Sequence, residues 1–252
     1  MQTKKVLLLC GDGFNCEFEL KKAFERAGGE VNLVHIFDFL KNPDLLLQSS
    51  IFAIPGGFSF GDEIRSGKIL AEKVRPILEN NLTQFLKQNG LIIGVCNGFQ
   101  VLVQLGVFEH KSGKLPLQRK LTLATNNHGQ FRDLWAQCTI SEMAAKRSPW
   151  LKNLGNQKVI LPIRNKEGRL VVHESSVLRS EVSWVSALKF DSDVNGSFEQ
   201  IAGIVDETGQ IFGLMPHPEA ALEDFLYPVK HDEANKNNAK LLFKIFENAI
   251  NF

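Results

Sequence analysis

The chain has 252 residues, of which 44% are hydrophobic, as expected for one folded domain with a sizeable core. Its 29 Lys and Arg balance 28 Asp and Glu, so the overall charge gives no reason to expect a nucleic acid or an anionic membrane as partner. No apolar run reaches the roughly 18 residues of a membrane span, and the four cysteines lack the density of a disulfide scaffold. We therefore expect a single cytoplasmic domain over residues 1–252, with reduced thiols.

The first part of the chain alternates apolar segments with amphipathic ones. Strands are predicted in three largely apolar segments, at 5–10, 31–36 and 51–54. An amphipathic helix is predicted between the first two, with Asn15 as its N-terminal cap and Gly28 just beyond its end. This β-α-β pattern with short connections is typical of a parallel sheet that helices cover on both faces.

A long helix is predicted over 68–89, with a kink or a second start at Pro76, and an apolar strand follows it at 91–95. Further along, the apolar segments become shorter and turns separate them, which indicates mixed or antiparallel strands. These strands are predicted at 121–124, 134–140, 158–163, 169–172, 183–189, 201–205 and 210–214, before a terminal amphipathic helix. The expected fold is α/β, with an open, mixed, mostly parallel, flavodoxin-like sheet.

The segment Gly94-Val95-Cys96-Asn97-Gly98 has the form G-x-C-x-G between a predicted strand and a predicted helix. That is the context of a nucleophile elbow, where flanking glycines let the chain turn sharply and expose the nucleophile. The helix N-terminus behind Cys96 favours a thiolate. We interpret Cys96 as a catalytic nucleophile and the other three cysteines, Cys10, Cys16 and Cys138, as small buried residues.

A nucleophilic cysteine needs an imidazole to carry protons and a third group to orient that imidazole. His217 and Glu219, in the segment Met-Pro-His-Pro-Glu, supply both groups. Prolines on either side of His217 favour an extended backbone, in which the His217 and Glu219 side chains point the same way. Acyl transfer also needs oxyanion donors, and we assign these to the backbone N–H groups of Gly57, after the third strand, and Asn97, after the nucleophile.

Four segments resemble a known family: IPGGFSFGDEIRSG at 54–67, GVCNGFQVL at 94–102, VNGSFEQIAGI at 194–204 and GLMPHPEA at 213–220. The triad and the Gly-Gly loop are similar to those of class I glutamine amidotransferases in general. The PGGFS and CNGFQ forms are more particular to one member family, the glutaminase subunits of phosphoribosylformylglycinamidine synthase, which acts in de novo purine biosynthesis.

The resemblance implies an enzyme that hydrolyses glutamine to glutamate and ammonia through a Cys96 thioester, with Gly56 and Gln100 in contact with glutamine and Arg65 at a subunit interface. It implies a partner synthetase subunit, with or without a small third subunit, which uses ATP and the ammonia to convert formylglycinamide ribonucleotide to formylglycinamidine ribonucleotide. This chain is expected to need no metal or cofactor. ATP and Mg²⁺ are expected on the partner, because this chain lacks a phosphate-binding G-x-x-x-x-G-K-[ST] motif.

The chain departs from the family pattern in three places, and we expect none of them to touch the triad. Ala220 replaces an arginine, residues 165–168 read Asn-Lys-Glu-Gly in place of His-Gly-Glu-Gly, and residues 13–16 read Gly-Phe-Asn-Cys in place of an early Pro-Gly-Thr-Asn-Cys.

Other hypotheses for the function remain open. The chain could serve another synthase, act as a free-standing cysteine hydrolase, or be a non-catalytic thiol sensor of the same fold.

Overall fold

The structure, a computed structural model, describes residues 3–116, 118–173, 183–228 and 233–252. Nine described strands form one mixed sheet in the order β2-β1-β3-β4-β11-β10-β9-β6-β7. The parallel strands are β1 (Lys5–Cys10), β2 (Glu30–His35), β3 (Ile51–Ile54), β4 (Leu91–Val95) and β11 (Ile211–Leu214). Antiparallel pairing then adds β10 (Ile201–Asp206), β9 (Trp184–Phe190), β6 (Arg132–Ile140) and β7 (Lys158–Asn165).

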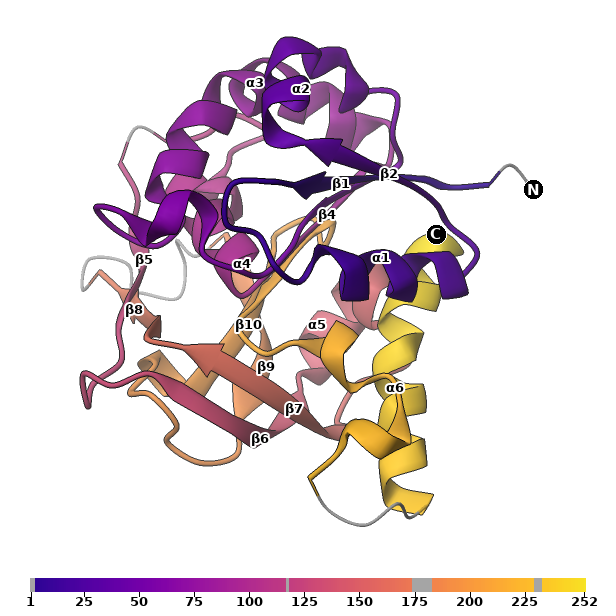
Figure 1. Cartoon of the computed structure of the whole chain (residues 1–252), viewed down its shortest axis with the longest axis vertical. Coiled ribbons are helices and arrows are strands. Elements are labelled where there is room, and N and C mark those ends of the chain that lie inside the picture. The colour runs from indigo at the N-terminus through magenta and orange to yellow at the C-terminus, as the bar shows by residue number, and fades with distance from the viewer. Residues whose placement is uncertain (1–2, 117, 174–182, 229–232) are drawn as a thin grey trace.

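Helices cover both faces of the parallel part of the sheet (Figure 1). Helices α1 (Glu17–Arg26) and α6 (Glu233–Ile250) contact each other on one face. The other face carries α2 (Ile36–Lys41), α3 (Lys68–Lys87) and α4 (Asn97–Leu105). A short helix, α5 (Glu142–Arg147), contacts β9, and a separate two-stranded sheet pairs β5 (Leu121–Thr125) with β8 (Glu167–Val172). No helix within the described residues is long and apolar enough to cross a membrane.

The predicted strands and the mixed α/β fold are confirmed, with shifts of one or two residues at their ends. Three details differ from the prediction. Of the two alternatives at Pro76, a second helix start is excluded, because Lys68–Lys87 form one helix that runs through Pro76 and packs against α4. Cys16, not Asn15, occupies the N-cap position of α1, and no side chain caps that helix. The short helices α2 and α5 were missed.

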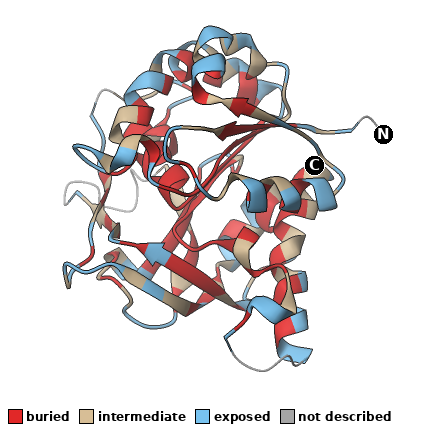
Figure 2. Cartoon of the chain, viewed as in Figure 1, coloured by how far each residue is buried: buried red, intermediate tan, exposed pale blue. Residues whose placement is uncertain are grey.

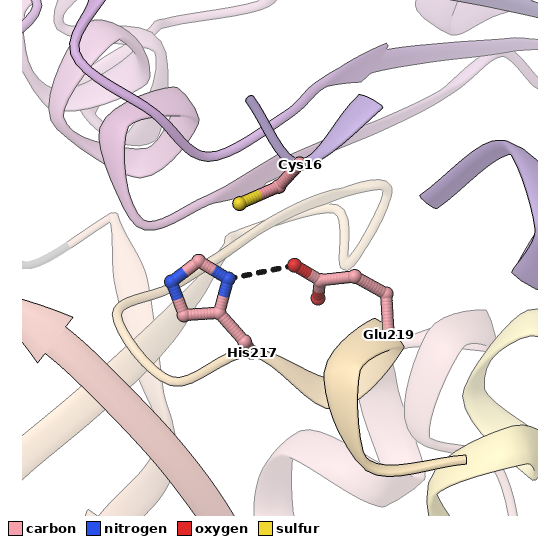
Figure 3. Close-up of side chains that lie close together, drawn as sticks. All are labelled: Cys16, His217 and Glu219. Atoms are coloured by element: carbon pink, nitrogen blue, oxygen red, sulfur yellow. Dashed lines mark hydrogen bonds and ion pairs between the residues drawn. The ribbon is translucent and has the colours of Figure 1, made fainter. Parts of the chain in front are cut away.

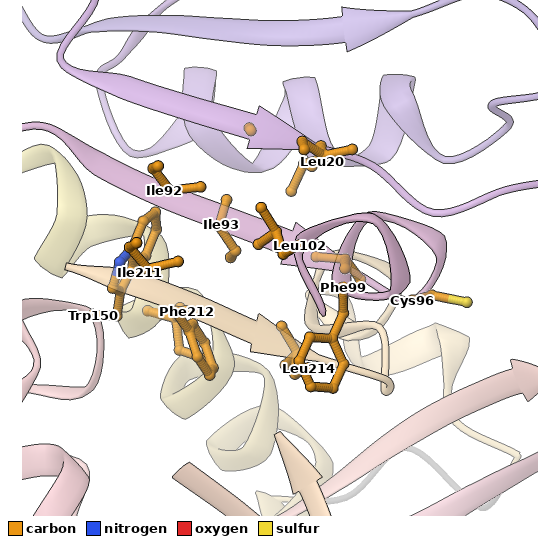
Figure 4. Close-up of a cluster of buried hydrophobic side chains, with 14 of the residues drawn as sticks. Leu20, Ile92, Ile93, Cys96, Phe99, Leu102, Trp150, Ile211, Phe212 and Leu214 are labelled. Atoms are coloured by element: carbon orange, nitrogen blue, oxygen red, sulfur yellow. The ribbon is translucent and has the colours of Figure 1, made fainter. Parts of the chain in front are cut away.

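The core is centred on the strands that lead to the predicted elbow. Every residue of β3, β4, β10 and β11 is buried, and so is every residue of α4 (Figure 2). Figure 4 shows Phe99 and Leu102 of α4 beside Leu214 of β11, within a cluster of large apolar side chains. Because every residue of α4 is buried, including the polar ones, the helix is enclosed on all sides. Packing therefore fixes the position of α4 and of Cys96 before it.

Gly98 gives a direct test of this close packing. A Cβ at Gly98 would lie 2.0 Å from the Ile54 carbonyl oxygen, which is backbone and cannot rotate away. Alanine normally stabilises a helix relative to glycine by about 1 kcal/mol. We expect Gly98→Ala to do the opposite and to lower the free energy of unfolding by about 1–3 kcal/mol, as overpacking does. Urea denaturation measures this change, and an unchanged or raised stability would show that α4 is not seated on β3 in this way.

Candidate active site

Cys96 lies at the joint between β4 and α4, on a strongly bent backbone. Its φ is 51° and its ψ is −105°, a conformation that a residue with a Cβ rarely adopts. Two backbone hydrogen bonds hold this bend: the Cys96 N–H donates to the Leu214 carbonyl at 2.8 Å, and the Gln100 N–H donates to the Cys96 carbonyl at 3.0 Å. The predicted elbow geometry is therefore present, with the thiol placed at the first turn of a helix.

His217 and Glu219 follow β11, the neighbour of β4 in the sheet. The His217 N–H donates to the Pro162 carbonyl at 2.9 Å, and His217 Nδ1 lies 2.7 Å from Glu219 Oε1 (Figure 3). The expected reason for this pairing was wrong, because Pro218–Ala221 form a 3-10 turn rather than an extended segment. The turn nevertheless brings the carboxylate to the ring, and both side chains are almost completely buried.

The other ring nitrogen of His217, Nε2, is buried and has no hydrogen-bond partner in the structure. Burial alone would lower the pKa of His217, but the charge of Glu219, with further contributions from Cys96 and Cys16, raises the pKa well above its ordinary value. The Cys96 thiol itself is directed at the Arg164 carbonyl, 3.7 Å away. This looser arrangement is common before substrate binds.

Cys16 is the residue near His217 that the sequence analysis missed. Figure 3 shows its sulfur beside the imidazole of His217, and a Cβ on Gly56 would lie 3.2 Å from that sulfur and 2.6 Å from His217 Cε1. Interpreting Cys16 as an ordinary buried residue was therefore wrong, since its half-exposed thiol contacts a candidate catalytic side chain.

A cavity of about 220 Å³ opens in front of the Cys96 sulfur. Cys96, Gly57 and Gln100 line it together with Phe58, Asp62, Ser66, Phe131, Arg164, Asn165, Lys166 and Glu167. The altered segment 165–168 thus borders the space in front of the nucleophile. Sequence alone gave no signal for this, because the segment reaches the site through the link between β7 and β8.

The candidate oxyanion donors come from two different elements, the loop after β3 and the first turn of α4. Asn97 is the first residue of α4, so its N–H has no partner within the helix. Gly57 has a φ of 142°, and a Cβ there would lie 2.7 Å from the Gly13 carbonyl oxygen, so glycine alone fits this turn. The side chain of Asn97 braces the same loop, because its Oδ1 accepts a hydrogen bond from the Ser59 N–H at 3.1 Å.

The far wall of the cavity is polar and tightly connected. Gln100 donates a hydrogen bond to the Glu167 carbonyl and accepts one from Asn97 Nδ2 at 3.0 Å, so its amide is oriented by the protein. Asp62 accepts hydrogen bonds from Asn97 at 3.0 Å and Ser66 at 2.8 Å. Burial raises the pKa of Asp62, and the nearby charge of Glu167 raises it further. The cavity is thus lined by acidic residues, by the Gln100 amide and by the basic residues Arg164 and Lys166. This mixture of charges suits a small zwitterionic ligand.

A strained cysteine elbow, a buried His–Glu pair and backbone donors on a flavodoxin-like sheet define an acyl-transfer site of the cysteine type. Residues 3–252 match the family model for the CobB/CobQ-like glutamine amidotransferase domain. The chain belongs to this glutamine amidotransferase family.

The relatives are more specific. A protein of Dehalococcoides mccartyi named phosphoribosylformylglycinamidine synthase subunit PurQ is 36% identical, covering 99% of this chain and 98% of its own length. A protein of Methanococcus maripaludis with the same name is 33% identical, covering 98% and 97%. Among solved structures, PurLQS from Thermotoga maritima matches with a TM-score of 0.75 and 27% identity over 99% of both chains. A glutamine amidotransferase from the same organism, 13% identical with a TM-score of 0.58 over 99% of this chain and 97% of its own, shares the fold.

The raised pKa of His217 can be tested directly. Burial lowers the pKa of His217, and the negative charge of Glu219 opposes this effect. Because Glu219→Gln removes that charge, we expect the pKa of His217 to fall. NMR titration of the histidine ring nitrogens measures this shift. Glu199→Gln, which changes an exposed glutamate paired with Lys189, is the matched control and should leave the His217 pKa in place. The same pKa in Glu219→Gln as in the wild type would contradict the assigned cause.

Proposed function

We propose that this chain is the glutaminase subunit of a phosphoribosylformylglycinamidine synthase, with the whole span 1–252 acting as one amidotransferase domain. The observation that carries the proposal is the strained elbow at Cys96, which interacts electrostatically with the buried His217–Glu219 pair. Support for the purine reaction comes from relatives of that name over nearly the full chain. The cytoplasmic location expected from the sequence is part of the proposal.

In the proposed mechanism the Cys96 thiol gives its proton to His217 and the sulfur attacks the Cδ carbon of glutamine. The oxyanion that forms is held by the backbone N–H groups of Gly57 and Asn97. As the C–N bond breaks, His217 returns the proton to the departing nitrogen, which leaves as ammonia and a Cys96 thioester remains. Water, activated by His217, hydrolyses the thioester to glutamate and regenerates the thiol.

The other site residues orient these groups. Glu219 holds the His217 ring through Nδ1 and stabilises its protonated form, so that Nε2 is left for proton transfer. Gly56 keeps the loop close to His217 because no side chain fits between them. Gln100 is the proposed contact for the amino acid part of glutamine, through the wall that it forms with Glu167.

The ammonia is proposed to pass to a synthetase subunit, which converts formylglycinamide ribonucleotide to formylglycinamidine ribonucleotide. ATP and Mg²⁺ are proposed to bind that partner, and the solved structure of PurLQS from Thermotoga maritima is a relevant relative. A free-standing hydrolase or another synthase would use the same site, so the partner decides between them. A thiol sensor is disfavoured, because a sensor needs neither the His217–Glu219 pair nor an oxyanion site.

The role of Glu219 predicts a graded loss of activity. Glu219→Gln should slow glutamine hydrolysis by about 10²–10⁴-fold, as in other triads whose orienting carboxylate is changed, while the protein stays folded. Glutamate release measures the rate, and circular dichroism checks the fold. Glu199→Gln is the control and should keep the wild-type rate. Unchanged turnover in Glu219→Gln would remove Glu219 from the site.

A second prediction separates an amidotransferase from a simple hydrolase. Cys96→Ser should lower the glutamine-dependent reaction of the complex with its synthetase by at least about 10³-fold, because the covalent path is lost. The reaction driven by high ammonium salt should persist, since the synthetase then takes ammonia from solution. Cys10→Ser, at a half-buried cysteine of β1, should leave both reactions in place. Formation of formylglycinamidine ribonucleotide from glutamine at the normal rate by Cys96→Ser would refute the proposal.

A further inference from the structure

Three metal-ligating side chains meet beside the proposed active site. The Cys16 sulfur, a ring nitrogen of His217 and a carboxylate oxygen of Glu219 all lie within 4.8 Å of one another (Figure 3). The proposed glutaminase mechanism uses His217 and Glu219 but has no role for Cys16. The cluster therefore offers a combination of sulfur, nitrogen and oxygen that the reaction does not explain.

Two further features favour a ligand at this place. Glu219 Oε2 is buried and has no hydrogen-bond partner in the structure, and the Glu219 residue is only 5% exposed. Cys16 is also held firmly. Its N–H donates to the Gly56 carbonyl at 3.3 Å, and its own carbonyl accepts a hydrogen bond from the Leu20 N–H at 3.2 Å. These bonds fix the Cys16 backbone, and the thiol donates a hydrogen bond to Asn15 Oδ1 at 3.1 Å.

We propose that Cys16, His217 and Glu219 form an inhibitory binding site for Zn²⁺ or a similar thiophilic divalent cation. Ligand atoms that share one tetrahedral zinc ion lie about 3.3–3.6 Å apart, given Zn–S bonds near 2.3 Å and Zn–N and Zn–O bonds near 2.0–2.2 Å. The present separations, of which the His217–Glu219 contact is 2.7 Å, come to these values through small side-chain movements. Water would complete the coordination.

The chemistry of the ligands decides which cation binds. Thiolate and imidazole ligands select zinc over Mg²⁺, which prefers oxygen ligands in a strict octahedron. The site would therefore not bind the Mg²⁺ that is proposed for the partner synthetase. On binding, the Cys16 thiol and the protonated His217 ring each release one proton to solvent, and the sulfur and the freed ring nitrogen bond the metal. The metal also occupies the ring nitrogen or the carboxylate that His217 and Glu219 need for proton transfer, which is why binding inhibits. This regulatory role rests on the proposed function.

Cobalt substitution tests the site without any activity measurement. Co²⁺ added to the purified full chain should give a sulfur-to-cobalt charge-transfer band and the intense visible bands of a four-coordinate ion. The bands should persist in Cys96→Ser and in Cys10→Ser and should disappear in Cys16→Ser. Persistence of the sulfur band in Cys16→Ser, its loss in Cys96→Ser, or no band in the wild type would overturn the proposal.

Glutamine hydrolysis then tests the inhibition. Saturating Zn²⁺ should slow glutamate release by the wild type at least about tenfold, and Mg²⁺ at the same concentration should not. Each variant is compared with its own rate in the presence of a chelator. Cys16→Ser should need at least about tenfold more Zn²⁺ for half-inhibition, because a ligand is lost, whereas Cys10→Ser should match the wild type. Equal sensitivity of Cys16→Ser and the wild type would refute the assigned site. A chain that binds Co²⁺ through Cys16 but never hydrolyses glutamine would instead refute the proposed function.

Discussion

The backbone bend at Cys96 is the constraint on which the rest of the site depends. A residue with a Cβ at a φ of 51° is strained by about 1–3 kcal/mol, and only surrounding structure can hold it there. The enclosed helix α4, the hydrogen bond from Cys96 to Leu214 and the contact of Gly98 with Ile54 supply that structure. The hydrophobic core thus determines where the sulfur lies, and the cavity, the backbone donors and the imidazole are arranged around it.

The buried pair of His217 and Glu219 is the second element of the site, and it is an electrostatic one. Removing both groups from water is costly, and their mutual attraction offsets that cost only while they stay in contact at 2.7 Å. The same attraction raises the pKa of His217 against the effect of burial. A protonated imidazole beside a thiolate is the charge arrangement that favours attack by sulfur, so the stability of the pair and its proposed chemistry have one origin.

The sequence predicted the parts of the fold and site that depend on local pattern. An apolar strand such as β4, the G-x-C-x-G elbow, and the pair of His217 and Glu219 can each be recognised within a short stretch of sequence. Cys16 was missed because it meets His217 only through the strand order β1-β3-β4-β11, which joins the start of the chain to residue 217. The cavity wall at 165–167 was missed for a similar reason. Local propensity also failed at the short helices α2 and α5 and at the 3-10 turn after His217, where tertiary contacts decide the conformation.

The central claim is that Cys96, and not Cys16, is the nucleophile, although both sulfurs lie near His217. Acid quenching of the enzyme during turnover with isotope-labelled glutamine, followed by peptide mass spectrometry, identifies the cysteine that carries the glutamyl thioester. The account predicts the label on the peptide that contains Cys96 and none on the peptide that contains Cys16. A glutamyl group on Cys16, or hydrolysis of glutamine with no cysteine ever labelled, would contradict it.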